Sequence, residues 1–314
     1  MDRRAFLVEL YPKLVAYHSW LYEERDLQGS GLVTLIHPWE CGLDTTPPWM
    51  QELCAMPMPW WLRVSERLDL ARVVRRLRND TRYLPAAERA SDDEGLRMLV
   101  LATRAKAHDF ELRRMRSEDS VLIQDVAFNA ILAKANRSLT LIAGELGQTV
   151  TPGLRARMGR TDGALESLWD EGSGQYFSRN ATTGALMKLP TIATFLPLWS
   201  GAPARERATR LVALLKTPGA FWPRYPVPSV PLDAPGFREA GYWKGPTWLN
   251  TAWMIVEALQ EYGEGDLAED LRVRTIDLVA RSGFSEYFSP ITGAPHGAPD
   301  FSWTAALTID LLTA

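Results

Sequence analysis

Hydrophobic residues recur at spacings of three and four along most of the chain, which is the period of an amphipathic α-helix. The clearest stripes predict helices over residues 5–24, 118–147 and 246–262, and Gly147 and Gly263 stand where the last two would end. Weaker stripes predict six further helices, over 60–78, 92–115, 152–169, 204–216, 265–281 and 302–313. No segment alternates with period two long enough for a substantial sheet, so the pattern predicts an all-α protein.

The segments between these helices are long, rich in Gly and Pro, and loaded with aromatic and charged residues. The longest of them cover residues 28–49, 171–190, 217–246 and 283–301. Long loops on a helical scaffold are usually functional or disordered, and the aromatic content argues against disorder here. We therefore expect the functional residues to lie on these loops.

Two of the loops repeat one another. Tyr176-Phe177-Ser178 precedes a Thr-Gly pair at 183–184, and Tyr287-Phe288-Ser289 precedes another at 292–293. Such an echo between helices indicates repeated helix-hairpin units, and a closed ring of them is an (α/α) toroid whose loops gather at one end. No Pro/Ser-rich linker divides the chain, so we expect a single domain over residues 1–314.

The composition is that of a folded protein with little net charge. Of 314 residues, 46% are hydrophobic and 23% charged, and the formal net charge is −3, a balance typical of globular chains. Lys and Arg are scattered among Asp and Glu, so no basic stripe indicates nucleic acid or an anionic membrane as a partner. Cys41 and Cys54 are too few for a disulfide framework.

The chain shows no sign of export or membrane insertion. It has no run of about 18 apolar residues, the length that a membrane span needs. Its first segment keeps Glu9, Lys13 and His18, which a signal peptide would lack. We therefore expect no membrane span and a cytoplasmic location.

Tryptophan is over-represented, with 12 residues. Core packing explains many tryptophans, but it is a weaker explanation for four that lie beside Gly, Pro and charged residues: Trp39, Trp49, Trp243 and Trp248. Flat rings beside polar groups suit sugars, whose C–H faces stack on aromatic rings while their hydroxyls bind polar groups. A small carbohydrate is therefore the substrate class that the loops favour.

Two carboxyl groups on these loops have the surroundings that glycoside hydrolysis requires. Asp44 and Glu286 are far apart in the sequence, and each lies among aromatic residues, Gly and Pro. Hydrolysis needs one carboxyl group that holds a proton, which burial promotes, and one ionised carboxylate that takes a proton from water. The alternatives are structural, because Asp44 or Thr45 could cap the following helix and Glu286 could bond to neighbouring backbone.

Three phrases together resemble glycoside hydrolase family 63, and within it the bacterial mannosylglycerate and glucosylglycerate hydrolases. They are HPWECGLDTTPPW at 37–49, GYWKGPTWLNTAW at 241–253, and FSEYFSPITG at 284–293 with GAPDFSWTAALTIDLL at 297–312. The resemblance implies an (α/α)6 toroid and a hydrolase that inverts the anomeric carbon. It also implies that Asp44 is the general acid and Glu286 the general base, with about 6.5–9.5 Å between the two carboxyl groups.

The same resemblance implies the residues that bind substrate. Those that match positions lining the glycosyl pocket are Trp39, Gly42, Trp243 and Trp248. Arg78 and Tyr83, with Arg82 beside them, are similar to the family's glycerate-binding region, although the arginines could equally be part of a surface cluster. His108 and His296 have no ligand partner at metal-binding spacing, so we expect neither a metal nor a cofactor.

The chain departs from the family in two ways. Thr45-Thr46 follows the acid where relatives carry Asn-Ser. Relatives also extend further upstream, so the chain starts in what corresponds to a middle helix of the ring. We therefore expect an incomplete toroid whose first helix, through Phe6 and Tyr17 among others, leaves an apolar face for self-association. A trehalase-like or oligosaccharide-trimming α-glucosidase and an inactive sugar-binding fragment stay open as alternatives.

Overall fold

The computed structural model describes residues 2–59, 84–115 and 120–313, and ten α-helices account for about half of these residues. The helix predicted over 60–78 lies outside the described residues. The α-helices are α1 (Arg3–Glu24), α2 (Pro47–Ala55), α5 (Asp92–Ala107), α6 (Val126–Glu145), α7 (Pro152–Glu166), α8 (Leu196–Ser200), α9 (Arg205–Leu215), α10 (Leu249–Glu261), α11 (Gly265–Ser282) and α12 (Ser302–Thr313).

Three of the helix boundaries that differ from the sequence prediction do so because a loop residue has a competing partner or conformation. α6 starts at Val126 rather than near 118, since the side chain of Asp125 caps it by accepting from the Phe128 amide. α10 starts at Leu249 rather than 246, since Thr247 pairs its backbone with Phe288. α5 ends at Ala107 rather than 115, where the chain turns through residues with positive φ.

The described residues contain only short strands, as the sequence predicts. They form three antiparallel pairs: β1 (Ile123–Gln124) with β4 (Arg179–Asn180), β2 (Trp169–Asp170) with β3 (Gln175–Tyr176), and β5 (Tyr287–Phe288) with β6 (Pro295–His296). The two echoed phrases form similar turns, in which Gly184 and Gly293 both adopt positive φ and bond back to the residue four positions earlier.

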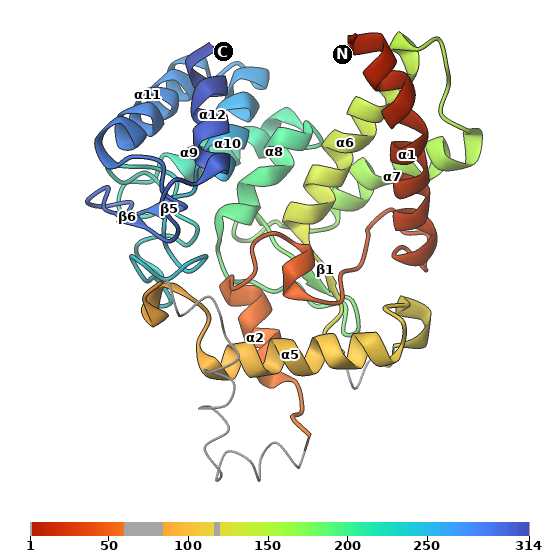
Figure 1. Cartoon of the computed structure of the whole chain (residues 1–314), viewed down its shortest axis with the longest axis horizontal. Helices are drawn as coiled ribbons and strands as arrows, with labels where there is room; N and C mark the ends of the chain where they lie inside the picture. The colour runs from red at the N-terminus through yellow and green to blue at the C-terminus, as the bar shows by residue number, and fades with distance from the viewer. Residues whose placement is uncertain (1, 60–83, 116–119, 314) are drawn as a thin grey trace.

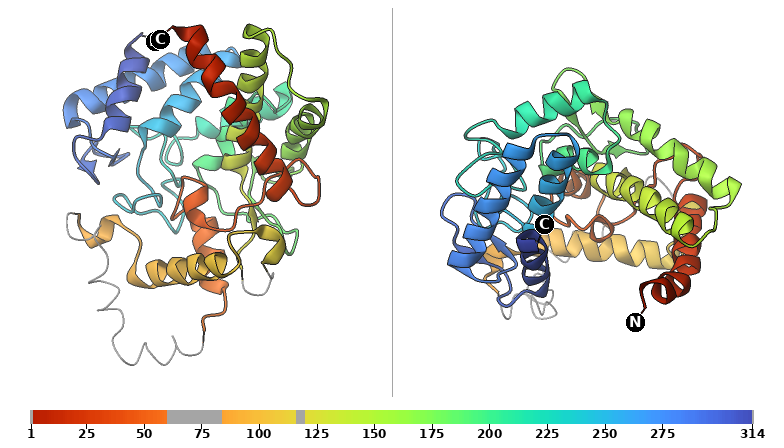
Figure 2. Two further views of the ribbon diagram at one scale, coloured as in Figure 1. Left: turned by 45° about the vertical axis from the view of Figure 1, so that its right-hand side comes forward. Right: turned by 90° about the horizontal axis from the view of Figure 1, so that it is seen from above.

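The helices pack in sequence around an arc. α6 packs against α1, α7 and α8, α8 packs against α10, and α10 packs against α11 and α12. Seen from above, this arc is a ring that is open between α1 and α12 among the described residues (Figure 2). The prediction of an (α/α) toroid is therefore confirmed, and α2 and α5 lie across its lower end (Figure 1).

The long loops gather at that same end, between the ring and α5, and the β5–β6 hairpin lies among them (Figure 1). This position brings loops from both halves of the sequence together. Within the described residues, no helix is long and apolar enough to cross a bilayer. The cytoplasmic location stays a prediction.

Candidate active site

Asp44 lies on a loop that the helical scaffold holds in place. His37 anchors the loop, because its Nε2 lies 3.0 Å from the Met98 carbonyl oxygen on α5 while its Nδ1 accepts from the Trp39 amide. α2 is capped at Thr46, with no hydrogen bond from a capping side chain. Asp44 therefore does not serve as a helix cap, which leaves its carboxyl group available for chemistry.

The neighbouring acid, Glu40, is engaged in structure instead. Both of its oxygens accept from Arg25, at 2.8 and 3.2 Å, and Oε2 also accepts from the Ile36 amide at 2.7 Å. The Arg25 side chain is 5% exposed, so this ion pair is partly shielded from water and fixes the loop in place. Glu40 is therefore a poor alternative to Asp44 as the proton donor.

The surroundings of Asp44 favour its protonated form. Burial is the largest influence and raises the pKa of Asp44 from 3.8 to about 6. A backbone hydrogen bond, a hydrogen bond with the Tyr242 side chain and the charge of Arg89 oppose this rise, while the charge of Glu286 adds to it. A carboxyl group with a pKa near 6 can hold a proton for donation close to neutral pH.

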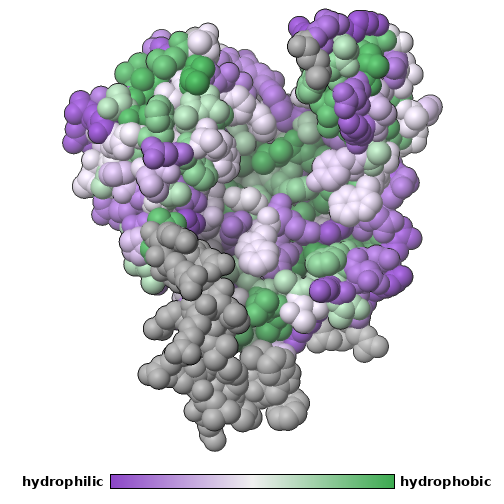
Figure 3. All heavy atoms as spheres, viewed as in Figure 1, coloured by the Kyte–Doolittle hydropathy of each residue, from purple (hydrophilic) through white to green (hydrophobic). Residues whose placement is uncertain are grey.

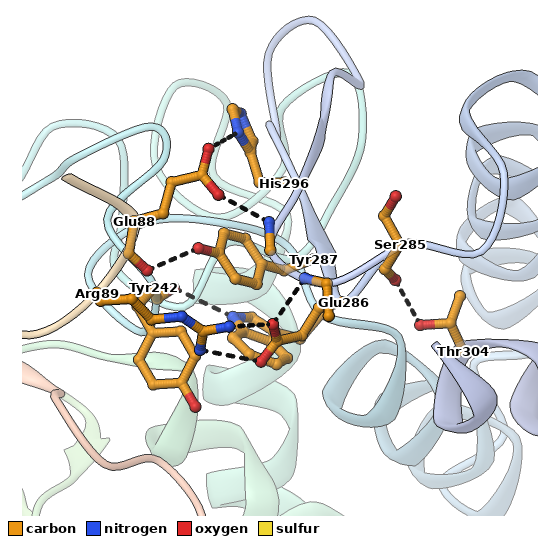
Figure 4. A network of polar contacts seen from close by, with 11 residues as sticks. Glu88, Arg89, Tyr242, Ser285, Glu286, Tyr287, His296 and Thr304 are labelled. Atoms are coloured by element: carbon orange, nitrogen blue, oxygen red, sulfur yellow. Dashed lines mark hydrogen bonds and ion pairs between the residues drawn. The ribbon is translucent and has the colours of Figure 1, made fainter. Parts of the chain in front are cut away.

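Glu286 immediately precedes β5 and is surrounded by hydrogen-bond donors. Its Oε2 accepts from Arg89 Nη2 at 2.6 Å and from the Ala298 amide at 3.0 Å, and its Oε1 lies 3.3 Å from Arg89 Nη1 (Figure 4). The residue is 7% exposed. A carboxylate with a guanidinium partner at this distance suits the role of a general base, which accepts a proton from water.

The structure thus brings Asp44 and Glu286 into one site. Each influences the pKa of Tyr242, which burial raises first and the two negative charges raise further. Arg89 also acts on both carboxyl groups, through its charge on Asp44 and through direct contact with Glu286. Inversion requires a separation of about 6.5–9.5 Å between the two carboxyl groups, and this separation stays a prediction.

The predicted sugar-binding tryptophans divide into two groups. Trp243 and Trp248 stack face to face at 3.9 Å between ring centroids, Trp248 stacks on Tyr287 at 4.7 Å, and both indoles are almost fully buried. Trp49 is buried as well and donates to Asp125. The expectation that core packing explains these three rings poorly is therefore wrong, because all three belong to the buried core. The contact of Trp243 and Trp248 with a sugar stays a prediction.

Trp39 and Gly42 have the exposure that a contact with substrate needs. The Trp39 side chain is exposed, and its ring packs against His37 at 4.4 Å. Gly42 has φ +73° and open space where a Cβ atom would point, so a ligand can approach its backbone closely. Their contact with a sugar stays a prediction.

The described residues add three participants and leave two predicted ones untested. Arg78 and Tyr83, with Arg82, lie outside the described residues. Sequence reasoning missed Glu88 and Arg89, which form part of the site and carry no motif that could have identified them. It also quoted Tyr242 within a phrase without assigning it a role. No group of three or more metal-ligating side chains occurs in the described part of the chain.

The fold and this site define a helical-toroid glycoside hydrolase. Residues 2–304 match the family described as the mannosylglycerate hydrolase MGH1-like glycoside hydrolase domain. The chain belongs to this family.

Relatives and a solved structure agree with this assignment. The chain is 36% identical over 300 residues to the mannosylglycerate hydrolase of Thermus thermophilus, covering 96% of the chain and 69% of the relative. It is also 36% identical over 304 residues to mannosylglycerate hydrolase MGH1 of Selaginella moellendorffii, covering 96% of the chain and 59% of the relative.

A crystal structure of the family 63 mannosylglycerate hydrolase from Thermus thermophilus, in complex with Tris and D-glycerate, superposes with a TM-score of 0.88. The two sequences are 34% identical, and the match covers 100% of this chain and 74% of the other. The chain therefore spans only part of the length of these similar proteins.

Proposed function

We propose that this chain hydrolyses an α-glycoside of glycerate, with mannosylglycerate favoured and glucosylglycerate as the alternative. The observation that carries the proposal is the meeting of the half-buried carboxyl group of Asp44 with the buried carboxyl group of Glu286, around Tyr242 and Arg89. The mannosylglycerate hydrolases that are 36% identical to the chain support the choice of sugar and aglycone.

In the proposed reaction, Glu286 takes a proton from a water molecule as that water attacks the anomeric carbon. Asp44 gives its proton to the glycosidic oxygen, so glycerate leaves as an alcohol and the sugar is released with inverted configuration. The raised pKa of Asp44 supports the donor role, and the arginine partner of Glu286 supports the base role. The proposed substrate contacts are Trp39, Gly42, Arg78, Tyr83, Trp243 and Trp248.

A hydrolysis assay with two carboxamide variants tests this proposal. Mannosylglycerate and glucosylglycerate should both be supplied, with trehalose and the neutral methyl glycosides as comparators. We expect glycerate release by the natural chain, a β-anomer as first product by NMR, and loss of kcat on the order of 10³-fold in Asp44→Asn and Glu286→Gln. Hydrolysis of trehalose in preference to the glycerate compounds, or equal rates in the variants, would overturn it.

We also propose that the chain self-associates through α1. Phe6, Tyr17 and Trp20 are large side chains on this helix with about half of their surface exposed. Soluble monomers rarely expose contiguous apolar patches beyond a few hundred Å². We expect light scattering to give a mass that rises with concentration, and a mass that stays constant would overturn this proposal.

A further inference from the structure

Arg89 makes the closest polar contacts of the candidate base. Its guanidinium group donates to both Glu286 oxygens, and its central carbon lies 4.8 Å from the centroid of the Tyr242 ring. The Arg89 side chain is 14% exposed. Burial alone would lower the pKa of Arg89, but the hydrogen bond and charge of Glu286 outweigh it and raise that pKa, so the group is a permanent cation.

These contacts distinguish the two oxygens of Glu286. Oε2 accepts from Arg89 Nη2 and from the Ala298 amide, and these two donors fill the two lone-pair positions of a carboxylate oxygen. Among the described residues, Oε1 accepts only the longer bond of 3.3 Å from Arg89 Nη1. Oε1 therefore keeps one lone pair that can accept a proton from water.

Arg89 is itself fixed to the hairpin that carries Glu286. The preceding residue, Glu88, accepts from the Gly297 amide at 2.8 Å and contacts His296 Nδ1 at 3.1 Å. The Tyr287 hydroxyl donates to the Glu88 carbonyl oxygen at 2.8 Å (Figure 4). These contacts link Glu88, and with it Arg89, to the β5–β6 hairpin.

We propose that Arg89 is a positioning residue for glycoside hydrolysis, which holds Glu286 so that Oε1 faces the attacking water. This inference rests on the proposed roles of Glu286 and Asp44. Arg89 acts through the base and needs no contact with the substrate. A guanidinium group suits the task, because its planar fork fixes both carboxylate oxygens where an ammonium group fixes one.

The charge of Arg89 has a second consequence, which can be measured in the pH dependence of kcat/KM. The titratable groups around it are Glu286, Asp44, Glu88, Tyr242, Tyr287 and His296. Among these, Asp44 is the proton donor, and the positive charge of Arg89 lowers the pKa of Asp44. Removing that charge raises the pKa of Asp44 further, so the alkaline fall of kcat/KM moves to higher pH.

The test compares Arg89→Ala and Arg89→Lys with the natural chain, using steady-state kinetics from about pH 4 to 9, which brackets the titration of Asp44. Arg89→Ala should lose kcat on the order of 10²-fold with little change in KM, and its alkaline limb should move upward from about pH 6. Arg89→Lys keeps the charge but not the fork, so kcat should fall less and the limb should stay in place.

Arg207→Lys is the matched control, because Arg207 forms a partly buried pair with Glu166 on α7, away from the site. It should leave kcat and the pH profile unchanged. Equal kcat in Arg89→Lys and the natural chain would overturn the inference. If Arg89→Ala fails to fold, the kcat of Arg89→Lys is sufficient to test the positioning role. An inactive natural chain would instead overturn the proposed function, which separates the two failures.

Discussion

At the scale of single residues, the site separates two carboxyl groups by their surroundings. Burial raises the pKa of Asp44 to about 6, whereas Glu286 is paired with Arg89. An acid and a base of the same chemical type therefore coexist within one site. Glu286 takes the role of the base and Asp44 that of the acid because Glu286 is the carboxyl group paired with the arginine.

The raised pKa of Asp44 predicts that this residue destabilises the fold at neutral pH. Between its usual pKa of 3.8 and the folded value of about 6, the folded state binds the proton more tightly than the unfolded state does. The bound proton therefore stabilises the folded state fully below pH 3.8, the usual pKa, and this stabilisation is lost as the pH rises through about 6. Asp44→Asn should therefore raise the free energy of unfolding at neutral pH by about 1–3 kcal/mol.

Urea unfolding at about pH 7 and about pH 4 checks this sign, because the gain should vanish at the lower pH. Asp170→Asn is the matched control with the opposite shift. Hydrogen bonding to Lys188 is the first of the causes that lower the pKa of Asp170 to about 2, so this substitution should weaken the fold at neutral pH. A destabilised Asp44→Asn protein would contradict the account of Asp44 given above.

Single residues also show what the sequence could and could not predict. Asp44 and Glu286 could be predicted because each lies in a phrase whose aromatic, Gly and Pro neighbours are unusual for a helix. Arg89 was not, since its role depends on Glu88 holding a hairpin some 200 positions away in the chain. Trp243 was misread because an indole beside a glycine can be core or cleft, and only packing decides.

At the scale of elements, the β5–β6 hairpin is the part that positions the base. Gly297 follows β6 with φ +70°, and a Cβ atom there would lie 2.5 Å from Glu286 Oε2 and 2.7 Å from the Tyr287 ring. The hairpin therefore requires glycine for space as well as for backbone conformation. Glu286 can keep its contacts with Arg89 only while this position has no side chain.

Gly297→Ala should therefore lose both activity and stability. We expect kcat to fall on the order of 10²-fold, because the base is displaced, and thermal unfolding to occur at lower temperature. Gly184→Ala is the matched control, since Gly184 has φ +74° in the echoed turn and open space around its Cβ position. It should cost about 1–2 kcal/mol for the backbone alone and leave kcat unchanged, whereas equal kinetic losses in both variants would refute the steric explanation.

Element boundaries show where periodicity stops being informative. The stripes located α1, α11 and α12 to within about two residues. One misplaced boundary is set by a tertiary hydrogen bond, the pairing of Thr247 with Phe288, and another by the local cap at Asp125. The five-residue α8 was missed altogether, because a segment this short has too few positions to display a helical period.

At the scale of the whole molecule, the described ring has two ends. α1 lies at one end and α12 at the other (Figure 2), and a hollow with an apolar floor separates the two sides of the molecule (Figure 3). The prediction for α1 was partly correct, since Phe6 and Tyr17 are exposed while Leu21 is buried. Both ends expose large apolar residues, which on α12 include Ile309 and Leu312.

An open ring of this kind should associate with itself, because hydrophobic burial stabilises contact by about 25 cal/mol per Å² of apolar surface. We expect light scattering to give a mass above the 35.2 kDa of one chain, rising with concentration. The double variant Phe6→Glu, Tyr17→Lys should return the chain to a monomer, since charges on α1 resist burial. Val273→Lys, at an exposed position on α11, is the matched control and should leave the mass unchanged. A natural chain whose mass stays at 35.2 kDa at every concentration would mean that the exposed apolar residues of α1 need no partner chain.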